Sequence, residues 1–237
     1  MKIDEKKLLE IAKHHLSAVK NYDPYANFDG VNDKNDFIKL INSDPAFANV
    51  GFANEKYVIA RIGGNLITSL HRKLGDMYEE MFQYMLSARF GVQEDDITFS
   101  VEVPIGDRMQ TRSTDGLLRS ARYGQLVLPS LKTDWKQADG IAFEIRSCYQ
   151  IGDSKRIQAD WDMALALKSQ NIVPVMLVTC ATSLKSPVAR LKRSWALYEG
   201  KDTFAFIHEL TGFDLNDFMA RNKATISKPV EEIMDSL

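Results

Sequence analysis

Apolar side chains recur at helical spacing in two stretches of the first half of the chain. One stripe predicts an amphipathic helix over residues 4–20, and a longer stripe predicts a helix over residues 66–90. The stretch between them, residues 21–57, is rich in Asn, Asp, Gly and Pro. Because these residues favour turns, we expect an arm or surface subdomain there, with a short helical patch near residues 37–41.

Short runs of apolar and β-branched residues dominate the second half of the chain. They predict strands over residues 97–105, 115–118, 140–149 and 172–180. Helical spacing predicts helices over residues 154–169, 187–199, 203–210 and 214–221. Residues 119–138 carry neither pattern and are predicted to form a basic loop.

The order of these elements predicts an α/β fold. Three consecutive strands form a meander, and a helix connects the last of them to a further strand, so the sheet is mixed and helices cover both of its faces. We therefore expect a single domain with a central mixed β-sheet flanked by helices. Its expected parts are an N-terminal helix and arm (residues 1–65), a core (residues 66–180) and a C-terminal helical part of the same domain (residues 181–237).

Composition narrows the class of protein. The chain has 237 residues, of which 45% are hydrophobic and 26% are charged, as in soluble globular proteins. No apolar run approaches the ~20 residues that a membrane span needs, and the charged N-terminus lacks a signal-peptide core. We therefore expect a cytoplasmic protein with no membrane partner. Cys148 and Cys180 are too few for a disulfide framework or a four-cysteine zinc site, and we predict two buried thiols.

Several motifs of enzyme chemistry are absent from the sequence. It has no G-x-S-x-G, P-loop, G-x-G-x-x-G or H-E-x-x-H motif, and its four histidines lack the spacing of metal ligands. We therefore expect no nucleotide cofactor.

Charge is distributed unevenly along the chain. The net charge is −2, but residues 101–200 carry 14 Lys and Arg against 10 Asp and Glu, which gives +4. Residues 1–100 (12 against 15) and residues 201–237 (4 against 7) each give −3. A local basic surface can bind a phosphate backbone. A solvated helix face is the other interpretation of the same pattern.

A group of charged residues lies in the predicted sheet. Glu144 and Arg146 interrupt an otherwise apolar strand, and their two-residue spacing directs both side chains to one face. Asp115 begins a neighbouring predicted strand, so two carboxylates and one cation are expected to meet at one edge of the sheet. Mg²⁺ binds one or two carboxylates together with water and phosphate oxygens. An ordinary Glu–Arg salt bridge is the alternative.

This pattern resembles the PD-(D/E)XK nuclease superfamily, which has an acid on one strand, Glu/Asp-x-Lys on the next, and then a helix and a strand. Here Asp115 is followed by Glu144-Ile145-Arg146, by a helix from Ser154 and by the strand over residues 172–180. The superfamily core opens with a helix that often carries an acid, and Glu79 and Glu80 fit that place. The stretch FEIRSCYQIGDSK, residues 143–155, is similar to type II restriction endonucleases of the ApaLI-like family.

The resemblance implies a Mg²⁺-dependent type II restriction endonuclease that cleaves double-stranded DNA at a palindromic site as a homodimer. It implies that Asp115 and Glu144 bind Mg²⁺, with Glu79 or Glu80 joining them from the first helix. Arg146 takes the place of the catalytic lysine. The implied products carry a 5′-phosphate and a 3′-hydroxyl.

The sequence departs from the family pattern at two positions. Thr114 stands where Pro is common, and Arg146 stands where Lys is usual. Arginine cannot act as a base, but it can orient water and stabilise charge on the phosphate. Lys155 and Lys132 are candidates to supply a lysine. Gln158, on the same helix face as Lys155, is a candidate to position water or phosphate.

Asp139 is a second candidate for the first metal ligand, because it also precedes the strand that carries Glu144. The odd spacing puts these two residues on opposite faces of a regular strand, which favours Asp115. Two further functions stay open: a structure-specific repair or recombination nuclease, and a DNA-binding protein that has lost catalysis. The cations predicted to bind DNA are Arg119, Arg122, Lys132, Lys136, Lys185, Arg190, Lys192 and Arg193.

Overall fold

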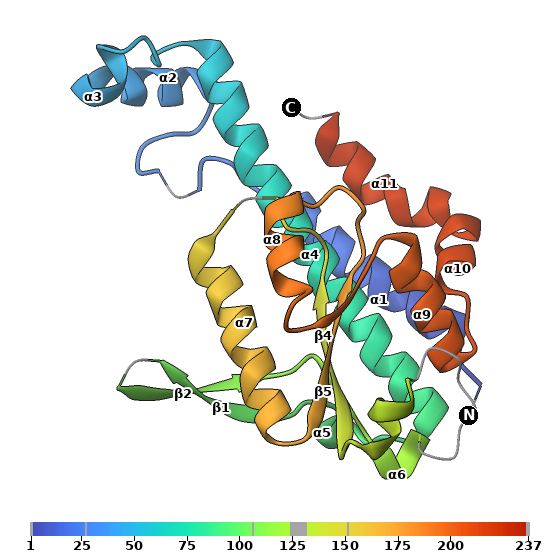
Figure 1. Ribbon diagram of the computed structural model, residues 1–237. Coiled ribbons are helices and arrows are strands. Elements are labelled where there is room, and N and C mark those ends of the chain that lie inside the picture. The colour runs from blue at the N-terminus through green and yellow to red at the C-terminus, as the bar shows by residue number, and fades with distance from the viewer. Residues whose placement is uncertain (1, 27, 106, 124–131, 151, 236–237) are drawn as a thin grey trace. The chain divides into compact units, whose positions relative to one another are not determined.

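The structure, a computed structural model, describes residues 2–26, 28–105, 107–123, 132–150 and 152–235 (Figure 1). The contacts within the chain divide it into two compact units. The first comprises Met1–Ile11 and Gly75–Lys223, and the second comprises Ala12–Leu74 and Ala224–Leu237. The long helix α4 (Glu55–Phe90) contributes to both units. The boundaries expected near residues 65 and 180 stay a prediction.

A four-stranded mixed sheet forms the centre of the first unit (Figure 1). Its order is β3-β4-β5-β6, in which β3 is antiparallel to β4 while β4, β5 and β6 run parallel. The strands are β3 (Gly116–Arg119), β4 (Gly140–Arg146), β5 (Ile172–Val178) and β6 (Ala196–Glu199). The predicted α/β class, with a central mixed sheet flanked by helices, is confirmed.

Helix α7 (Ser154–Ser169) connects the parallel strands β4 and β5 and spans the residues predicted for it. Asp153 caps its N-terminus, since the side chain of Asp153 accepts hydrogen bonds from two backbone amides of the first turn. One stripe of the helix, including Ile157 and Leu167, is buried in a core shared with β4 and β5. Ala142 of β4 belongs to this core, so the alternation along the strand directs Glu144 to the same face.

The second half of α4 and helix α9 (Lys201–Thr211) cover the opposite face of the sheet. The ring of Phe143 on β4 lies 5.0 Å from the ring of Phe82 on α4 and 6.4 Å from that of Phe206 on α9. The Phe206 ring also stacks on Tyr198 of β6, at 4.5 Å. Helices therefore cover both faces of the sheet, as the element order predicts.

Strands β1 (Ser100–Ile105) and β2 (Arg108–Ser113) form a separate antiparallel hairpin, which projects from the rest of the first unit in Figure 1. The predicted meander is therefore wrong in its first strand, because β1 pairs with β2 and not with β3. Val101 and Val103 of β1 are buried in the α7 core. By contrast, β2 is polar and largely exposed, so it lacks the apolar alternation on which a strand prediction depends.

The helix predicted over residues 187–199 is wrong in its second half. Helix α8 ends at Leu191 (Lys185–Leu191), and β6 follows, with Ala196 paired to Val175 of β5. A short apolar run that includes Trp195 fits a helix or a strand equally well. Pairing with β5 then decides the outcome, as tertiary contacts often do for strands.

Further helices complete the two units. In the first unit they are α5 (Glu94–Ile97), α6 (Ser120–Tyr123), the 3₁₀ helix η2 (Thr133–Gln137) and α10 (Leu215–Arg221). Helix α1 (Glu5–Ser17) and helix α11 (Lys223–Met234) each contribute residues to both units. The sequence pattern predicted α1 but not α11. The second unit contains the 3₁₀ helix η1 (Ala18–Asn21), α2 (Lys34–Ser43) and α3 (Pro45–Ala48).

The expected arm has a small core of its own within the second unit. Its buried apolar residues are Val31, Phe37, Ile41, Val58 and Ile62. The aromatic rings of Tyr25 and Phe28 pack on Phe37.

Among the helices of the described ranges, none combines the length and the apolar character that crossing a membrane requires.

The backbone at Gly200, immediately before α9, packs closely against Ala181. Its φ is 57°, and a Cβ at this position would lie 2.8 Å from the Cβ of Ala181. Gly200→Ala should therefore lower the free energy of unfolding by about 2–4 kcal/mol, through backbone strain and overpacking together. Urea unfolding measures this loss.

Gly212, at the other end of α9, is the matched control. Its φ is 73°, but a Cβ there would have no neighbour within 4 Å. Gly212→Ala should cost only about 1 kcal/mol, from the left-handed backbone alone. Equal losses in the two variants would contradict the close packing of Gly200 against Ala181.

Candidate active site

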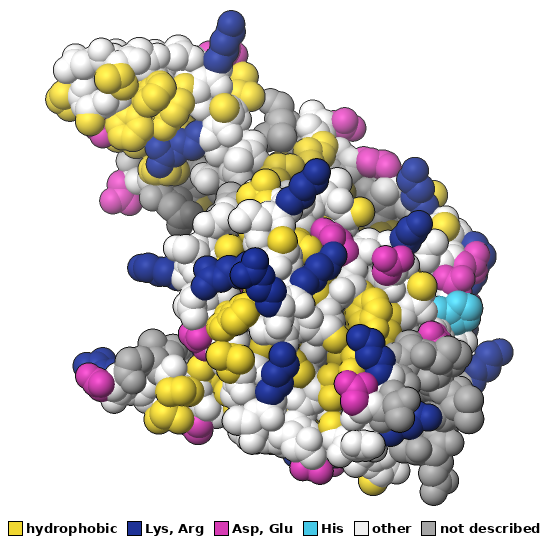
Figure 2. Space-filling model, in the orientation of Figure 1, with side chains coloured by type: hydrophobic (Ala, Val, Ile, Leu, Met, Phe, Trp, Pro, Cys, Tyr) yellow, Lys and Arg dark blue, Asp and Glu magenta, His cyan; other side chains and the backbone are white. Residues whose placement is uncertain are grey.

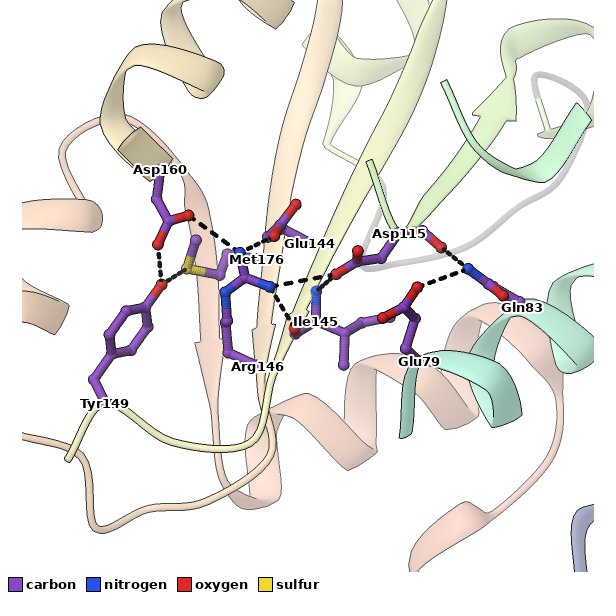
Figure 3. A network of polar contacts seen from close by, with 9 residues as sticks. All are labelled: Glu79, Gln83, Asp115, Glu144, Ile145, Arg146, Tyr149, Asp160 and Met176. Carbon is purple, nitrogen blue, oxygen red and sulfur yellow. Dashed lines mark hydrogen bonds and ion pairs between the residues drawn. The ribbon is translucent and has the colours of Figure 1, made fainter. Parts of the chain in front are cut away.

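Two carboxylates, on Asp115 and Glu144, lie close together in the four-stranded sheet region (Figure 3). Glu144 on β4 is 4% exposed. Asp115 immediately precedes β3, and because Gly116 pairs with Phe143, Asp115 lies one step further along, beside Glu144. The Asp115 amide donates to the Phe143 carbonyl over 2.9 Å, and its Oδ2 accepts from the Ile145 amide over 2.7 Å. Strand pairing therefore fixes the position of both carboxylates.

The guanidinium of Arg146 lies among three carboxylates (Figure 3). It contacts Oε1 of Glu144, its Nη2 lies 3.2 Å from Oδ1 of Asp160, and its Nη1 lies 3.7 Å from Oδ2 of Asp115. Nη1 also donates to the Ile145 carbonyl over 3.1 Å. The structure thus brings together the two carboxylates and the cation that the sequence placed at one sheet edge.

Asp160 and Tyr149 belong to the same cluster, and neither was predicted from the sequence. The Tyr149 hydroxyl donates to Oδ2 of Asp160 over 2.7 Å, and Nε1 of Trp195 donates to the Asp160 carbonyl over 2.8 Å. Asp160 is 4% exposed and follows Ile157 on the apolar stripe of α7. A carboxylate on such a stripe needs a buried partner, and that signal was present in the sequence.

Helix α4 links Glu79 to the cluster through Gln83, a residue that was not predicted from the sequence. The Gln83 side-chain amide donates to Oε1 of Glu79 over 3.2 Å and to the Asp115 carbonyl over 2.9 Å. Glu80, the alternative candidate on this helix, is half-buried and turned by about 100° from Glu79. We call the connected residues the polar network: Glu79, Gln83, Asp115, Glu144, Arg146, Tyr149 and Asp160.

Burial and mutual repulsion raise the pKa values of three carboxyl groups of the polar network, on Glu144, Glu79 and Asp115. Burial raises the pKa of Glu144 to about 8, since the charge of Arg146 offsets only part of the effect and the neighbouring carboxylates add to it. Burial and the charge of Asp115 raise the pKa of Glu79 to about 7. Burial also raises the pKa of Asp115, against the opposing charge of Arg146.

Arg146 stays charged in these surroundings. Burial disfavours its charged form, but the charges of Glu144, Asp160 and Asp115 outweigh burial and raise its pKa well above the ordinary value. One guanidinium therefore faces several carboxyl groups. The excess of negative charge favours the binding of a proton or of a further cation.

Two buried atoms of the polar network have no hydrogen-bond partner, Oε2 of Glu144 and Nε of Arg146. A buried unpaired acceptor is costly, and a carboxylate oxygen is the kind of ligand that Mg²⁺ prefers. In the described part of the chain, no group of three or more Asp, Glu, His and Cys side chains is placed to hold a metal ion. Asp115 and Glu144 could supply at most two carboxylate ligands to a cation such as Mg²⁺, so water and phosphate oxygens would have to supply the others.

Asp139 lies apart from the polar network. It is exposed, immediately before the first residue of β4. Five residues of extended chain separate it from Glu144, which is about 16 Å. Asp115 is therefore the carboxylate that the fold places beside Glu144.

The candidate side chains on α7 lie at the surface. Lys155 is exposed in the first turn. The Gln158 amide donates to Oδ1 of Asp162 over 2.7 Å, and its carbonyl oxygen accepts from Arg190 of α8. These contacts tie Gln158 to the surface of α7 and α8.

Lysine and arginine side chains gather over α8 and the N-terminal end of α7 in Figure 2. The exposed cations of these two segments are Lys155, Arg156, Lys185 and Arg190. The charge of Arg156 acts on the carboxyl of Asp115 and lowers its pKa, against the larger effect of burial. This basic surface therefore borders the polar network.

The other cations predicted to bind DNA lie elsewhere in the first unit. Lys132, Lys192 and Arg193 line a pocket of about 420 Å³ at the start of β5, at the end of the sheet away from Glu144. Lys132 also lies 5.7 Å from the Trp135 ring, and Arg119 lies 5.1 Å from the Phe99 ring. Arg122 donates a hydrogen bond to the Phe90 carbonyl. Lys136 is exposed. Residues 124–131 of the predicted basic loop lie outside the described residues.

Comparison of the chain with family models, with curated proteins and with solved structures gave no match.

The raised pKa values of Glu79 and Glu144 predict that the metal-free protein loses stability as the pH rises from about 5 to about 8. In this range the native state holds protons that the unfolded chain has released. Unfolding then releases protons and becomes more favourable as the pH rises. Each such proton contributes a slope of at most about 1.4 kcal/mol per pH unit.

Urea unfolding at several pH values measures this slope. Glu144→Gln should reduce it, because the amide cannot titrate. Glu10→Gln, at an exposed position on α1, is the control and should leave the slope unchanged. A slope that survives intact in Glu144→Gln would show that Glu144 does not hold a proton in the native state.

Proposed function

We propose that this protein is a Mg²⁺-dependent endonuclease that cleaves double-stranded DNA at a specific palindromic site, as type II restriction endonucleases do. The proposal rests on two neighbouring carboxylates, Asp115 immediately before β3 and Glu144 on β4, and on a buried Glu144 oxygen that lacks a hydrogen-bond partner. Two such carboxylates suit the ligand set that Mg²⁺ takes at phosphate sites.

The order of the elements supports the same proposal. Helix α4 carries Glu79, Asp115 precedes β3, and Glu144 lies on β4, followed by α7 and β5. This is the order of the PD-(D/E)XK pattern that the sequence resembles. The residues that the resemblance identifies lie together in the fold, and this supports the proposal.

Asp115 and Glu144 would hold Mg²⁺ beside the scissile phosphate. When bound, the ion supplies positive charge for the phosphate and lowers the pKa of an attacking water. Glu79, which Gln83 connects to the Asp115 carbonyl, would exchange a proton with that water.

Arg146 would stabilise the negative charge that develops on the phosphate. Its raised pKa excludes the role of a base, whereas its permanent positive charge beside Glu144 and Asp115 would attract a phosphate oxygen. Asp160, itself held by the Tyr149 hydroxyl, would act as a positioning residue for the guanidinium.

The basic surface of α7 and α8 would contact the DNA backbone. Contacts to phosphates supply affinity and carry no sequence information. A palindromic site has twofold symmetry, so cleavage of both strands calls for a homodimer. Recognition of the bases would come from parts of the chain outside the polar network.

A digest of long double-stranded DNA with Mg²⁺ tests the proposal, with Glu144→Gln as the decisive variant. The wild-type protein should give discrete fragments. Glu144→Gln should lose at least about 100-fold in cleavage rate, because even outer partners of a bound metal are worth 10–100-fold. Its binding to DNA in a gel-shift assay should be largely unchanged, because phosphate contacts lie elsewhere.

Asp115→Asn and Asp139→Asn are a matched pair in the same assay. The first should lose cleavage like Glu144→Gln, and the second should cut at the wild-type rate, because Asp139 lies at the other end of β4. Nicks at branched or damaged DNA would indicate a repair nuclease. Retention of DNA without any cleavage by the wild type would indicate a binding protein that has lost catalysis.

Two variants of Arg146 test whether this cation takes part in catalysis or has only a structural role. Arg146→Lys should retain measurable cleavage, because lysine keeps the charge and is the usual residue in the resembled motif. Arg146→Ala should lose about 10²–10³-fold, the effect of deleting one charge-stabilising group. Both rates are measured at saturating DNA, with circular dichroism to verify folding. If a folded Arg146→Ala variant cleaves DNA at the wild-type rate, Arg146 has only a structural role, as a salt-bridge partner.

A further inference from the structure

Cys148 and Cys180 lie side by side just beyond the ends of β4 and β5. These strands run parallel with Arg146 paired to Val178, and each cysteine comes two residues after its paired residue. The Cys180 amide donates to the Ser147 carbonyl over 3.0 Å, so the pairing continues past the strands. Neighbouring strands are about 4.8 Å apart, and the Cα atoms of bridged cysteines are about 4.4–6.8 Å apart. The backbone thus suits a disulfide.

Both sulfur atoms contact one hydroxyl group. Oγ of Ser183 lies 3.6 Å from Sγ of Cys148 and 3.4 Å from Sγ of Cys180. The Cys148 thiol also donates a hydrogen bond to Cys180. The predicted burial of the two thiols is wrong, since both are partly exposed. They are close to each other and within reach of a small reagent.

We propose that Cys148 and Cys180 form a reversible dithiol–disulfide site that is oxidised by a small disulfide such as glutathione disulfide. This proposal goes beyond the proposed function and does not depend on it.

The surroundings of the two sulfurs favour Cys180 as the attacking residue. Burial opposes its ionisation, but hydrogen bonds from Cys148, Ser183 and Thr182 outweigh burial and lower the pKa of the Cys180 thiol. The pKa of the Cys148 thiol is raised by burial and by the hydrogen bond that this thiol donates to Cys180. Because the thiolate is the nucleophile, Cys180 reacts first.

The reaction has two exchange steps. The Cys180 thiolate attacks one sulfur of glutathione disulfide, whose S–S bond breaks, so that one glutathione leaves as a thiolate and the other stays bound to Cys180. Cys148 then gives its proton to solvent and attacks the Cys180 sulfur, which releases the second glutathione. In total the two cysteines lose two electrons and two protons, and one glutathione disulfide becomes two glutathione thiols.

The disulfide would join the segments that follow β4 and β5. It would close a loop that contains α7 and β5, and such a constraint stabilises a protein chiefly by restricting the unfolded chain. Tyr149 directly follows Cys148 and donates to Asp160, so the bond would also restrain one side of the polar network.

Thiol titration and intact mass after treatment with glutathione disulfide test the proposal. The reduced full chain should lose both thiols, retain no glutathione, and have a mass lower by two hydrogen atoms. It should run as a monomer on a non-reducing gel, and dithiothreitol should restore both thiols. The midpoint of urea unfolding should be higher for the oxidised form.

Single variants separate the two steps. Cys148→Ser should stop at the mixed disulfide and keep one glutathione on Cys180. Cys180→Ser should take up glutathione on Cys148 several-fold more slowly. Two glutathiones bound to each wild-type chain, a disulfide between two chains, or thiols that remain unreacted would each overturn the proposal.

Discussion

The burial of one guanidinium group among carboxylates is the interaction on which this site depends. Arg146 contacts Glu144 on its own strand, Asp160 on α7 and Asp115 before β3. Each carboxylate alone would be too costly to bury. A single planar cation with five donors can serve all three, because its nitrogens point in different directions. The arginine thereby couples the strand order of the sheet to the position of α7.

The class of fold and much of the site could be predicted from the sequence, because both follow from local periodicity. The two-residue spacing of Glu144 and Arg146 is enough to place them on one face, and the boundaries of α7 coincide with its apolar stripe and its cap, Asp153. Asp160 was within reach of the same reasoning, since a carboxylate on a core stripe requires a partner.

Other features depend on contacts between distant segments and left no local signal. Strand β2 is polar and exists because β1 pairs with it. Strand β6 continues an apolar run that fits a helix or a strand equally well, and its pairing with β5 makes it a strand. The link from Gln83 to the Asp115 carbonyl spans 32 residues in sequence. The approach of Cys148 to Cys180 likewise requires the parallel register of β4 and β5.

A charge count shows how the polar network could accept a divalent ion without losing its arginine. Its four carboxyl groups, on Glu79, Asp115, Glu144 and Asp160, carry four negative charges when all are ionised. Arg146 supplies one positive charge and Mg²⁺ would supply two, so a single negative charge remains. A proton held by one of the four carboxyl groups would neutralise it. Because Asp160 also contacts the guanidinium, Arg146 would keep an ionic partner if Glu144 turned toward a bound ion.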